Sequence, residues 1–214
     1  ENLSLSPEIP VAGENAQLTF QLVANSEIDE LFVALGETYN SEDEIIELEK
    51  NLTAQSVELD LSAFGQDKMV YIKLVAIVSG DEYVRHSSIY LPRTIEASQL
   101  TTIADVQGVS NESPKLGQKV IVGGRVVANL DNSVYIQNGS GKYSGLCVFG
   151  SNQTGYVGDS VIVEGEVVEY SGLTELKNIS YFCNMKSNNP YEAKVLKVDE
   201  VGEDYEGMLV TIKN

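Results

Sequence analysis

The chain has 214 residues and carries 14 basic against 32 acidic residues, which gives a net charge of −18. A field of that sign repels phosphate backbones and anionic lipid headgroups, so the composition disfavours nucleic-acid and membrane-surface binding. No apolar run approaches the roughly 18 residues needed to span a membrane. The length suits one or two domains, and the patterns along the chain favour two.

The first 93 residues predict about seven short strands. Leu18, Phe20 and Leu22 alternate with polar residues, as in a strand with one buried face. The other expected strands are an edge strand that includes Pro7 and Pro10, and the stretches 28–35, 57–61, 69–78 and 83–91. The acidic stretch 37–50 fits either a short helix or a crossing strand. Short strands at this regular spacing indicate an immunoglobulin-like or fibronectin type III-like β-sandwich over residues 1–93.

The boundary between the halves is marked by composition. Residues 1–100 carry five basic and 18 acidic residues, whereas residues 101–214 carry nine and 14. Pro92-Arg-Thr94 is the expected hinge. After it, the apolar spacing in 98–109 predicts a short helix with Ser98 or Thr101 as its N-cap.

A repeated stretch organises the second half. The sequence Gly117-Gln-Lys-Val-Ile-Val-Gly-Gly-Arg-Val-Val127 recurs 41 residues later as Gly158-Asp-Ser-Val-Ile-Val-Glu-Gly-Glu-Val-Val168, with seven of eleven positions identical. Each copy is a β-branched run with a glycine before it and another inside it, which predicts a strand that enters from a turn and bends in its middle. The offset is too short to enclose a whole barrel, so the copies are expected to be two strands of one barrel.

Three further strands are expected at 133–138, 145–149 and 173–183, with a polar connector at 150–155. Five strands with a connector between the third and fourth predict an OB-fold-like barrel over residues 94–190, in which the repeat copies are strands one and four. Residues 191–214 are expected to add an extra strand or to begin a further β unit. The predicted fold class is therefore all-β.

Several stretches of the second half carry a resemblance. Thr102-Ile-Ala-Asp-Val106, the repeated element, Val134-Tyr-Ile-Gln-Asn-Gly-Ser-Gly141, Val157-Gly-Asp-Ser-Val161 and Tyr170-Ser-Gly-Leu-Thr-Glu-Leu176 resemble the OB-like domains of Bacteroidetes surface lipoproteins. Similar domains accompany some extracellular nucleases. The resemblance covers about residues 100–185 and implies an exported protein, at the cell surface or in the periplasm, that is lipid-anchored through a segment outside this chain.

Catalytic chemistry finds little support in the sequence. The single histidine, His86, lies in an expected strand, and we interpret it as a surface or hydrogen-bonded strand residue. The densest carboxylate cluster, Glu42-Asp-Glu44, lacks the spacing of a calcium loop and is interpreted as a solvated acidic loop. Cys147 and Cys183 have no metal-ligand spacing; two buried thiols are favoured over one disulfide. We therefore predict a noncatalytic protein with no cofactor and no metal.

A ligand-binding patch is predicted on the outer face of the barrel. OB-folds bind oligonucleotides or oligosaccharides on this face with aromatic and polar side chains. The candidate residues are Arg125, Tyr135, Gln137, Lys142 and Tyr143. Alternatively, Tyr135 only covers the sheet and Arg125 pairs with a nearby glutamate.

Two functions follow from this reasoning. The first is a noncatalytic cell-surface binding or scaffold protein, whose ligand is a glycan or a protein. The alternative is a nucleic-acid-binding accessory module of an extracellular nuclease system. The nine basic residues of the second half show no interleaving with aromatic residues, which counts against the alternative.

Overall fold

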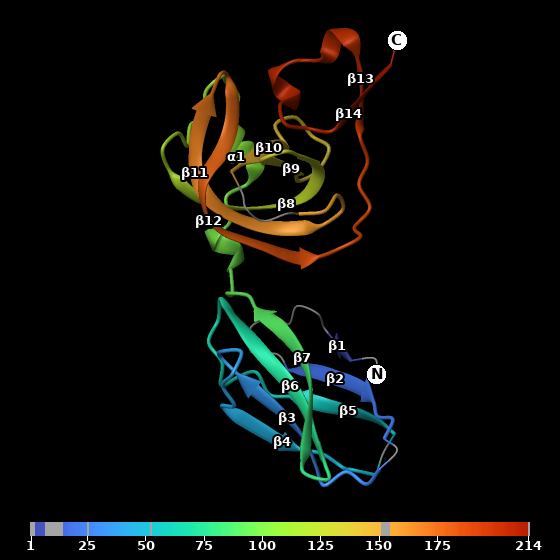
Figure 1. Ribbon diagram of the computed structural model, residues 1–214. Helices are drawn as coiled ribbons and strands as arrows, with labels where there is room; N and C mark the ends of the chain where they lie inside the picture. The colour runs from blue at the N-terminus through green and yellow to red at the C-terminus, as the bar shows by residue number, and fades with distance from the viewer. Residues whose placement is uncertain (1–2, 7–14, 25, 52, 151–154, 214) are drawn as a thin grey trace. The chain divides into compact units, whose positions relative to one another are not determined.

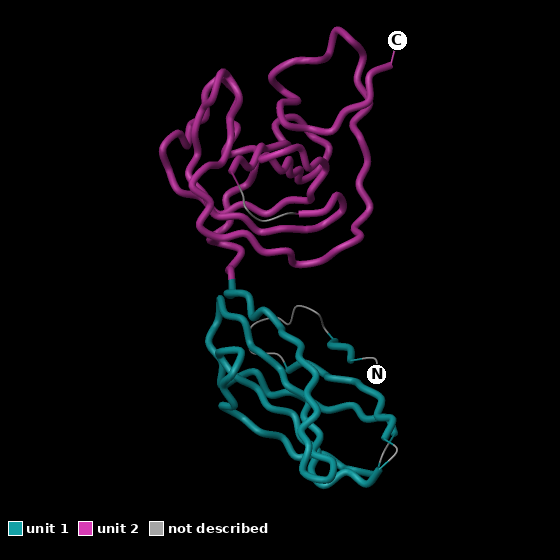
Figure 2. Tube along the Cα trace, viewed as in Figure 1, with its two compact units in different colours: residues 1–94 teal, residues 95–214 magenta. Residues whose placement is uncertain are grey.

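The computed structural model describes residues 3–6, 15–24, 26–51, 53–150 and 155–213. The chain divides into two compact units, Glu1–Thr94 and Ile95–Asn214 (Figure 2). Strands dominate both units (Figure 1), which confirms the expectation of a β protein. Within the described residues, no helix has the length and apolar character needed to cross a membrane. Pro7, Pro10 and residues 151–154 of the expected connector lie outside the described residues.

The first unit contains seven described strands in two sheets. They are β1 (Ser4–Ser6), β2 (Ala16–Gln21), β3 (Glu30–Gly36), β4 (Glu44–Glu47), β5 (Ala54–Leu59), β6 (Lys68–Val78) and β7 (Asp81–Leu91). One sheet has the order β1-β2-β5 and the other the order β4-β3-β6-β7, with antiparallel pairing throughout. The acidic stretch that fitted helix or strand thus forms β4 at the edge of the larger sheet.

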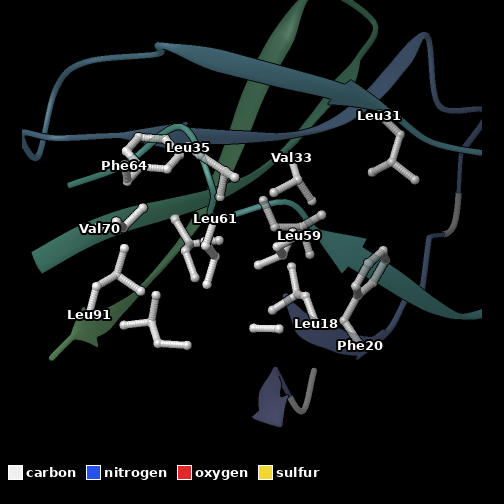
Figure 3. Packing of buried hydrophobic residues seen from close by; sticks show 14 of the residues in the cluster. Leu18, Phe20, Leu31, Val33, Leu35, Leu59, Leu61, Phe64, Val70 and Leu91 are labelled. Atoms are coloured by element: carbon white, nitrogen blue, oxygen red, sulfur yellow. The ribbon is translucent and has the colours of Figure 1, made fainter. Parts of the chain in front are cut away.

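One hydrophobic core joins the two sheets of this unit. In β2, Ala16, Leu18 and Phe20 are buried and the residues between them are exposed, so the predicted alternation is confirmed. Figure 3 shows Leu18 and Phe20 in one packed cluster with Val33 and Leu35 of the other sheet. Each such side chain contributes roughly 1.5–3 kcal/mol by leaving water, which makes this core the main source of the unit's stability.

The predicted helix between the halves forms two short elements, and its expected cap was wrong. A 3-10 helix, η1, spans Ala97–Gln99, and α1 spans Ile103–Gln107. The N-cap of α1 is Thr102, whose hydroxyl accepts the N–H of Asp105 at 3.0 Å. Ser98 lies within η1, and the N–H of Thr101 is bonded to the carbonyl of Ile121 at 2.8 Å. Thr101 therefore pairs with the following strand instead of capping the helix.

The second unit is built on a closed barrel of five strands. They are β8 (Lys119–Leu130), β9 (Ser133–Gln137), β10 (Gly145–Phe149), β11 (Ser160–Tyr170) and β12 (Leu173–Lys186). Around the barrel the order is β8-β9-β10-β12-β11, and β11 closes on β8. All neighbours are antiparallel except β10 and β12, which are parallel. The expected five barrel strands are thus present and close into one sheet.

The two repeat copies are neighbouring strands of this barrel. β8 and β11 pair antiparallel about Val122 and Val163, which occupy the same position in the two copies. The leading glycines adopt positive φ, 74° at Gly117 and 97° at Gly158, so each strand does enter from a turn. The inner glycine of the second copy, Gly165, lies at a shift of register between β11 and β12, where the strand bends.

The first copy bends elsewhere than predicted. Its register shift against β9 lies between Val126 and Ala128, beyond the inner glycine Gly124. Gly124 serves a different purpose, because a Cβ there would stand 3.1 Å from the Cβ of Ile136. A close approach of two strands, and not a bend, therefore requires this glycine.

Residues beyond the barrel form a small element of their own. β13 (Lys194–Lys197) and β14 (Val210–Lys213) pair in parallel, and the 3-10 helices η2 (Val198–Glu200) and η3 (Glu203–Tyr205) lie between them (Figure 1). The sequence suggested an extra strand or the start of a further unit. The described residues form a two-stranded sheet that belongs to the second unit.

Candidate functional site

A cleft of about 590 Å³ lies on the outside of the barrel beside the first repeat copy. We call it the barrel cleft. Its polar or aromatic lining residues are Arg125, Gln137, Asn138, Ser140, Ser160, Tyr191 and Glu192. The floor comes from β8 and β11, where Arg125 and Ser160 face each other across the ladder. One wall is the loop after β9, and the other is the segment around Pro190 that follows β12.

Arg125 is the main hydrogen-bond donor of the barrel cleft. Its Nη1 donates to the carbonyl of Pro190. Its Nε is buried and has no acceptor among the described residues. A guanidinium group carries five N–H donors, and it remains charged at every physiological pH. The contact with Pro190 thus fixes the side chain while leaving donors for a ligand.

The other lining side chains add acceptors, hydroxyls and an aromatic ring. Asn138 is oriented by the carbonyl of Gly123, to which its Nδ2 donates at 3.4 Å. Tyr191 is 44% exposed, and Glu192 beside it is exposed as well. Sites that bind polar organic molecules combine apolar surface with a few fixed polar groups. The barrel cleft has this composition, and it holds both a positive and a negative side chain.

Three of the sequence-predicted residues contact the C-terminal segment, by which we mean residues 203–209. Gln137 accepts the N–H of Leu209 at 3.0 Å. Lys142 forms an ion pair with the carboxylate of Asp204, and the hydroxyl of Tyr143 donates to that carboxylate. The N–H of Tyr143 also donates to the Asp204 carbonyl at 2.7 Å. These residues therefore attach the C-terminal segment to the barrel.

The middle of the C-terminal segment lies close against β10 and β12. Gly207 packs on Gly145 so closely that a Cβ on Gly145 would overlap the Gly207 backbone. The carboxylate of Glu206 accepts the N–H of Thr174 at 3.0 Å. Burial raises the pKa of Glu206 above its usual value of 4.5, and Glu203 and Glu169 add to the rise. A carboxyl group is thus held in a poorly solvated position by this packing.

Tyr135 lies in a row of partly or fully buried polar side chains that occupy paired positions on neighbouring barrel strands. The row runs across β9, β10 and β12 as Tyr135, Cys147 and Glu175. Burial raises the pKa of Tyr135, and Cys147, Glu175 and Glu206 raise it further. The buried Glu175 pairs with Lys177 at 3.3 Å. Cys147 and the other cysteine, Cys183, are both buried and are not joined by a disulfide.

The structure brings Arg125 and Gln137 together in the barrel cleft, with Gln137 also bonded to the C-terminal segment. It does not place Tyr135, Lys142 or Tyr143 in the lining of the cleft. The alternative for Arg125, a pair with a glutamate, is replaced by its bond to Pro190. Sequence reasoning missed Asn138, Ser160, Tyr191 and Glu192. For Tyr191 and Glu192 the reason is that residues 190–192 carry no periodic pattern to show that they return to the barrel.

Among the described residues, no three histidine, cysteine, aspartate or glutamate side chains gather as a metal site would require. Comparisons with protein-family models, with curated proteins and with solved structures each returned no match to the chain.

Proposed function

We propose that the first unit is an immunoglobulin-like β-sandwich and the second an OB-fold-like barrel. The sheets β1-β2-β5 and β4-β3-β6-β7 follow the order A-B-E and C′-C-F-G of immunoglobulin-type domains, which supports the first assignment. The barrel order first, second, third, fifth, fourth supports the second, together with the parallel pairing of the third and fifth strands.

We further propose that the protein is a noncatalytic binding protein whose barrel cleft takes a glycan. The observation that carries this proposal is the fixed guanidinium of Arg125 in a cleft that also holds Tyr191. A sugar offers many hydroxyl oxygens to N–H donors, and its C–H faces pack on aromatic rings. The amide of Asn138 and the carboxylate of Glu192 would accept from further hydroxyls.

Charge favours a glycan over a nucleic acid. A strand of nucleic acid needs a positive surface to follow its backbone, whereas the cleft is lined by one arginine and one glutamate in a chain of net charge −18. A neutral sugar experiences no such repulsion. The alternative of a nucleic-acid-binding module therefore becomes an outcome that the test can detect.

Localisation enters the proposal through resemblance. An immunoglobulin-like unit before an OB-like barrel resembles the exported surface lipoproteins described above, and we propose a cell-surface or periplasmic location with a lipid anchor. Glycan capture at a cell surface is a task that a binding protein without catalytic residues can perform.

The test is binding of the full chain to a glycan array, followed by calorimetry with the best ligand. Replacing Arg125 by alanine should weaken binding by about tenfold or more, because a charge-assisted hydrogen bond is worth about 1.5–3 kcal/mol. Tyr191→Ala should also weaken binding, because it removes the aromatic ring of the cleft. Tyr156→Ala is its matched control and should bind as the unaltered chain does, since Tyr156 is exposed in the same unit but does not line the cleft. Salt-sensitive binding of single-stranded DNA, lost in Arg125→Ala, would instead support the nucleic-acid alternative.

A further inference from the structure

The loop between β3 and β4 presents an aromatic side chain from a rigid frame. The carboxylate of Asp43 accepts the N–H of Glu37 at 2.8 Å and the hydroxyl of Ser41 at 3.0 Å. Thr38 and Ser41 form two reciprocal hydrogen bonds. The N–H of Thr38 donates to the Ser41 hydroxyl at 3.0 Å, and the N–H of Ser41 donates to the Thr38 hydroxyl at 3.2 Å. Tyr39 lies inside this network, so its backbone is ordered before any ligand arrives.

The ring of Tyr39 lies over the outer face of the sheet β4-β3-β6-β7. It stacks on His86 of β7, with ring centroids 4.5 Å apart and planes 18° apart. It also meets Tyr71 of β6 edge to face, at 6.1 Å and 80°. His86 and Tyr71 belong to the outer face because the neighbours of Tyr71 along β6, Val70 and Ile72, point into the core.

Tyr39 is 53% exposed although it makes two ring contacts. One face of the ring rests on His86, and the exposed fraction requires that much of the rest meets water. A tyrosine whose only role is packing would bury its apolar ring and leave just the hydroxyl in water. The ring is instead held in place and left open, which is the arrangement of a binding platform.

Polar groups with fixed positions surround the platform. Lys73, opposite His86 in the ladder, pairs with Glu42 at 3.0 Å and reaches the carbonyl of Asn40 at 3.4 Å. Ser88, exposed, lies opposite Tyr71. A ligand on the exposed ring of Tyr39 would find hydrogen-bonding partners in the same loop and on the adjacent strands.

We infer that Tyr39, His86 and Tyr71 form a second carbohydrate site, which we call the aromatic cluster, and that it takes one sugar ring of a neutral oligosaccharide. This inference rests on the proposed function and adds a site on the first unit. A sugar matches the site because its C–H face packs on an aromatic ring while its hydroxyls bond to the polar rim. A neutral ligand is specified because residues 1–100 carry a net charge of −13, which repels sulfated and uronic-acid sugars.

The experiment is residue-resolved NMR of the full chain, titrated separately with neutral cello-, xylo-, manno- and malto-hexasaccharides. We expect saturable shifts of the amides of Tyr39, Asn40 and His86 with at least one of these sugars. Tyr39→Ala should weaken this binding on the order of tenfold, and Tyr39→Phe should retain it, because the ring and not the hydroxyl forms the platform.

Tyr83→Ala is the matched control, because Tyr83 is 58% exposed on the same strand as His86 but has no place in the aromatic cluster. Each variant is checked for folding by its unfolding curve, and His86→Ala tests the support beneath the ring. Shifts confined to Arg125, Asn138 and their neighbours, unaffected by Tyr39→Ala, would overturn the aromatic cluster and leave the barrel cleft standing. Shifts confined to the aromatic cluster would support that site and overturn the barrel cleft as a glycan site. An absence of shifts with all four sugars would overturn both sites.

Discussion

The N–H of Gly117 donates to the carbonyl of Val167 at 2.8 Å, and the N–H of Gly158 donates to the carbonyl of Val126 at 2.9 Å. These four residues are two equivalent pairs, since Gly117 corresponds to Gly158 and Val126 to Val167 in the repeat. The two copies thus bond reciprocally about a local two-fold axis. Similar sequences at 117–127 and 158–168 are explained by this symmetry, because the same position needs the same residue on either strand.

The glycines of the repeat differ in what a side chain would meet. A Cβ at Gly165 would stand 2.8 Å from a methyl of Ile179 and 2.9 Å from the Lys177 carbonyl, whereas one at Gly123 would meet only the Val161 carbonyl at 3.9 Å. Gly165→Ala should therefore cost about 1–3 kcal/mol through overpacking. Gly123→Ala is the control and should change stability by less than about 1 kcal/mol. Urea unfolding of both variants measures the difference, and equal losses would contradict this account.

Attachment of the C-terminal segment should depend on Asp204. Its carboxylate holds both Lys142 and Tyr143, so Asp204→Ala should loosen residues 203–209 from the barrel. We expect faster hydrogen exchange at the amides of Tyr143 and Leu209, with little change inside β8 or β11. Asp199→Ala, an exposed carboxylate of the same tail, serves as the control. Unchanged exchange at Tyr143 would show that Gly145 and Gly207 packing alone holds the segment.

The same attachment should weaken as pH rises above 4.5. Burial raises the pKa of Glu206 in the folded state, so the folded protein binds this proton more tightly than the unfolded chain. The stabilisation is complete below 4.5 and is lost as pH rises through the raised pKa. Hydrogen exchange at the Leu209 amide, followed as the pH is raised from 4.5, measures the loss of this stabilisation. Glu206→Gln should remove the pH dependence while retaining an acceptor for the Thr174 N–H.

Asp204 acts in a separate pH window. Hydrogen bonds from Lys142 and Tyr143 hold its pKa below the usual 3.8, so its contribution is present above 3.8 and lost as pH falls through the lowered pKa. Loss of most of the attachment before the pH has fallen to 3.8 would contradict the assignment of Asp204.

Both thiols should be unreactive in the folded protein. Cys147 is 1% exposed and Cys183 is 4% exposed, and burial raises the pKa of Cys147, which lowers its thiolate fraction. A thiol reagent such as 5,5′-dithiobis(2-nitrobenzoate) should label neither cysteine in buffer and both in urea. Mass spectrometry of the labelled, unreduced chain in urea tests for a disulfide between the two cysteines, because a disulfide would leave both of them unlabelled.

Sequence alone determined the elements whose signals are local. Alternation at Leu18 and Phe20 and the β-branched repeat each predicted structure that the chain forms. Two short hairpin turns, Ser79-Gly80 and Ser171-Gly172, join neighbouring antiparallel strands. In both Ser-Gly turns the two residues have positive φ, from 52° to 85°, which serine and glycine tolerate in a two-residue hairpin. The count of five barrel strands followed from the same signals, whereas their order around the barrel is known only from the tertiary structure.

Only the tertiary structure decided where the candidate site residues lie. Lys142 and Tyr143 were nominated as ligand contacts, but Asp204 returns from 61 residues away to bond Tyr143. The barrel cleft likewise depends on Pro190 meeting Arg125, and the aromatic cluster on Tyr39 meeting His86. Local patterns report how a segment buries its own side chains, whereas these contacts join segments that have no periodic relation. The sequence therefore determined the strands and their turns, and the packing of distant segments determined the sites.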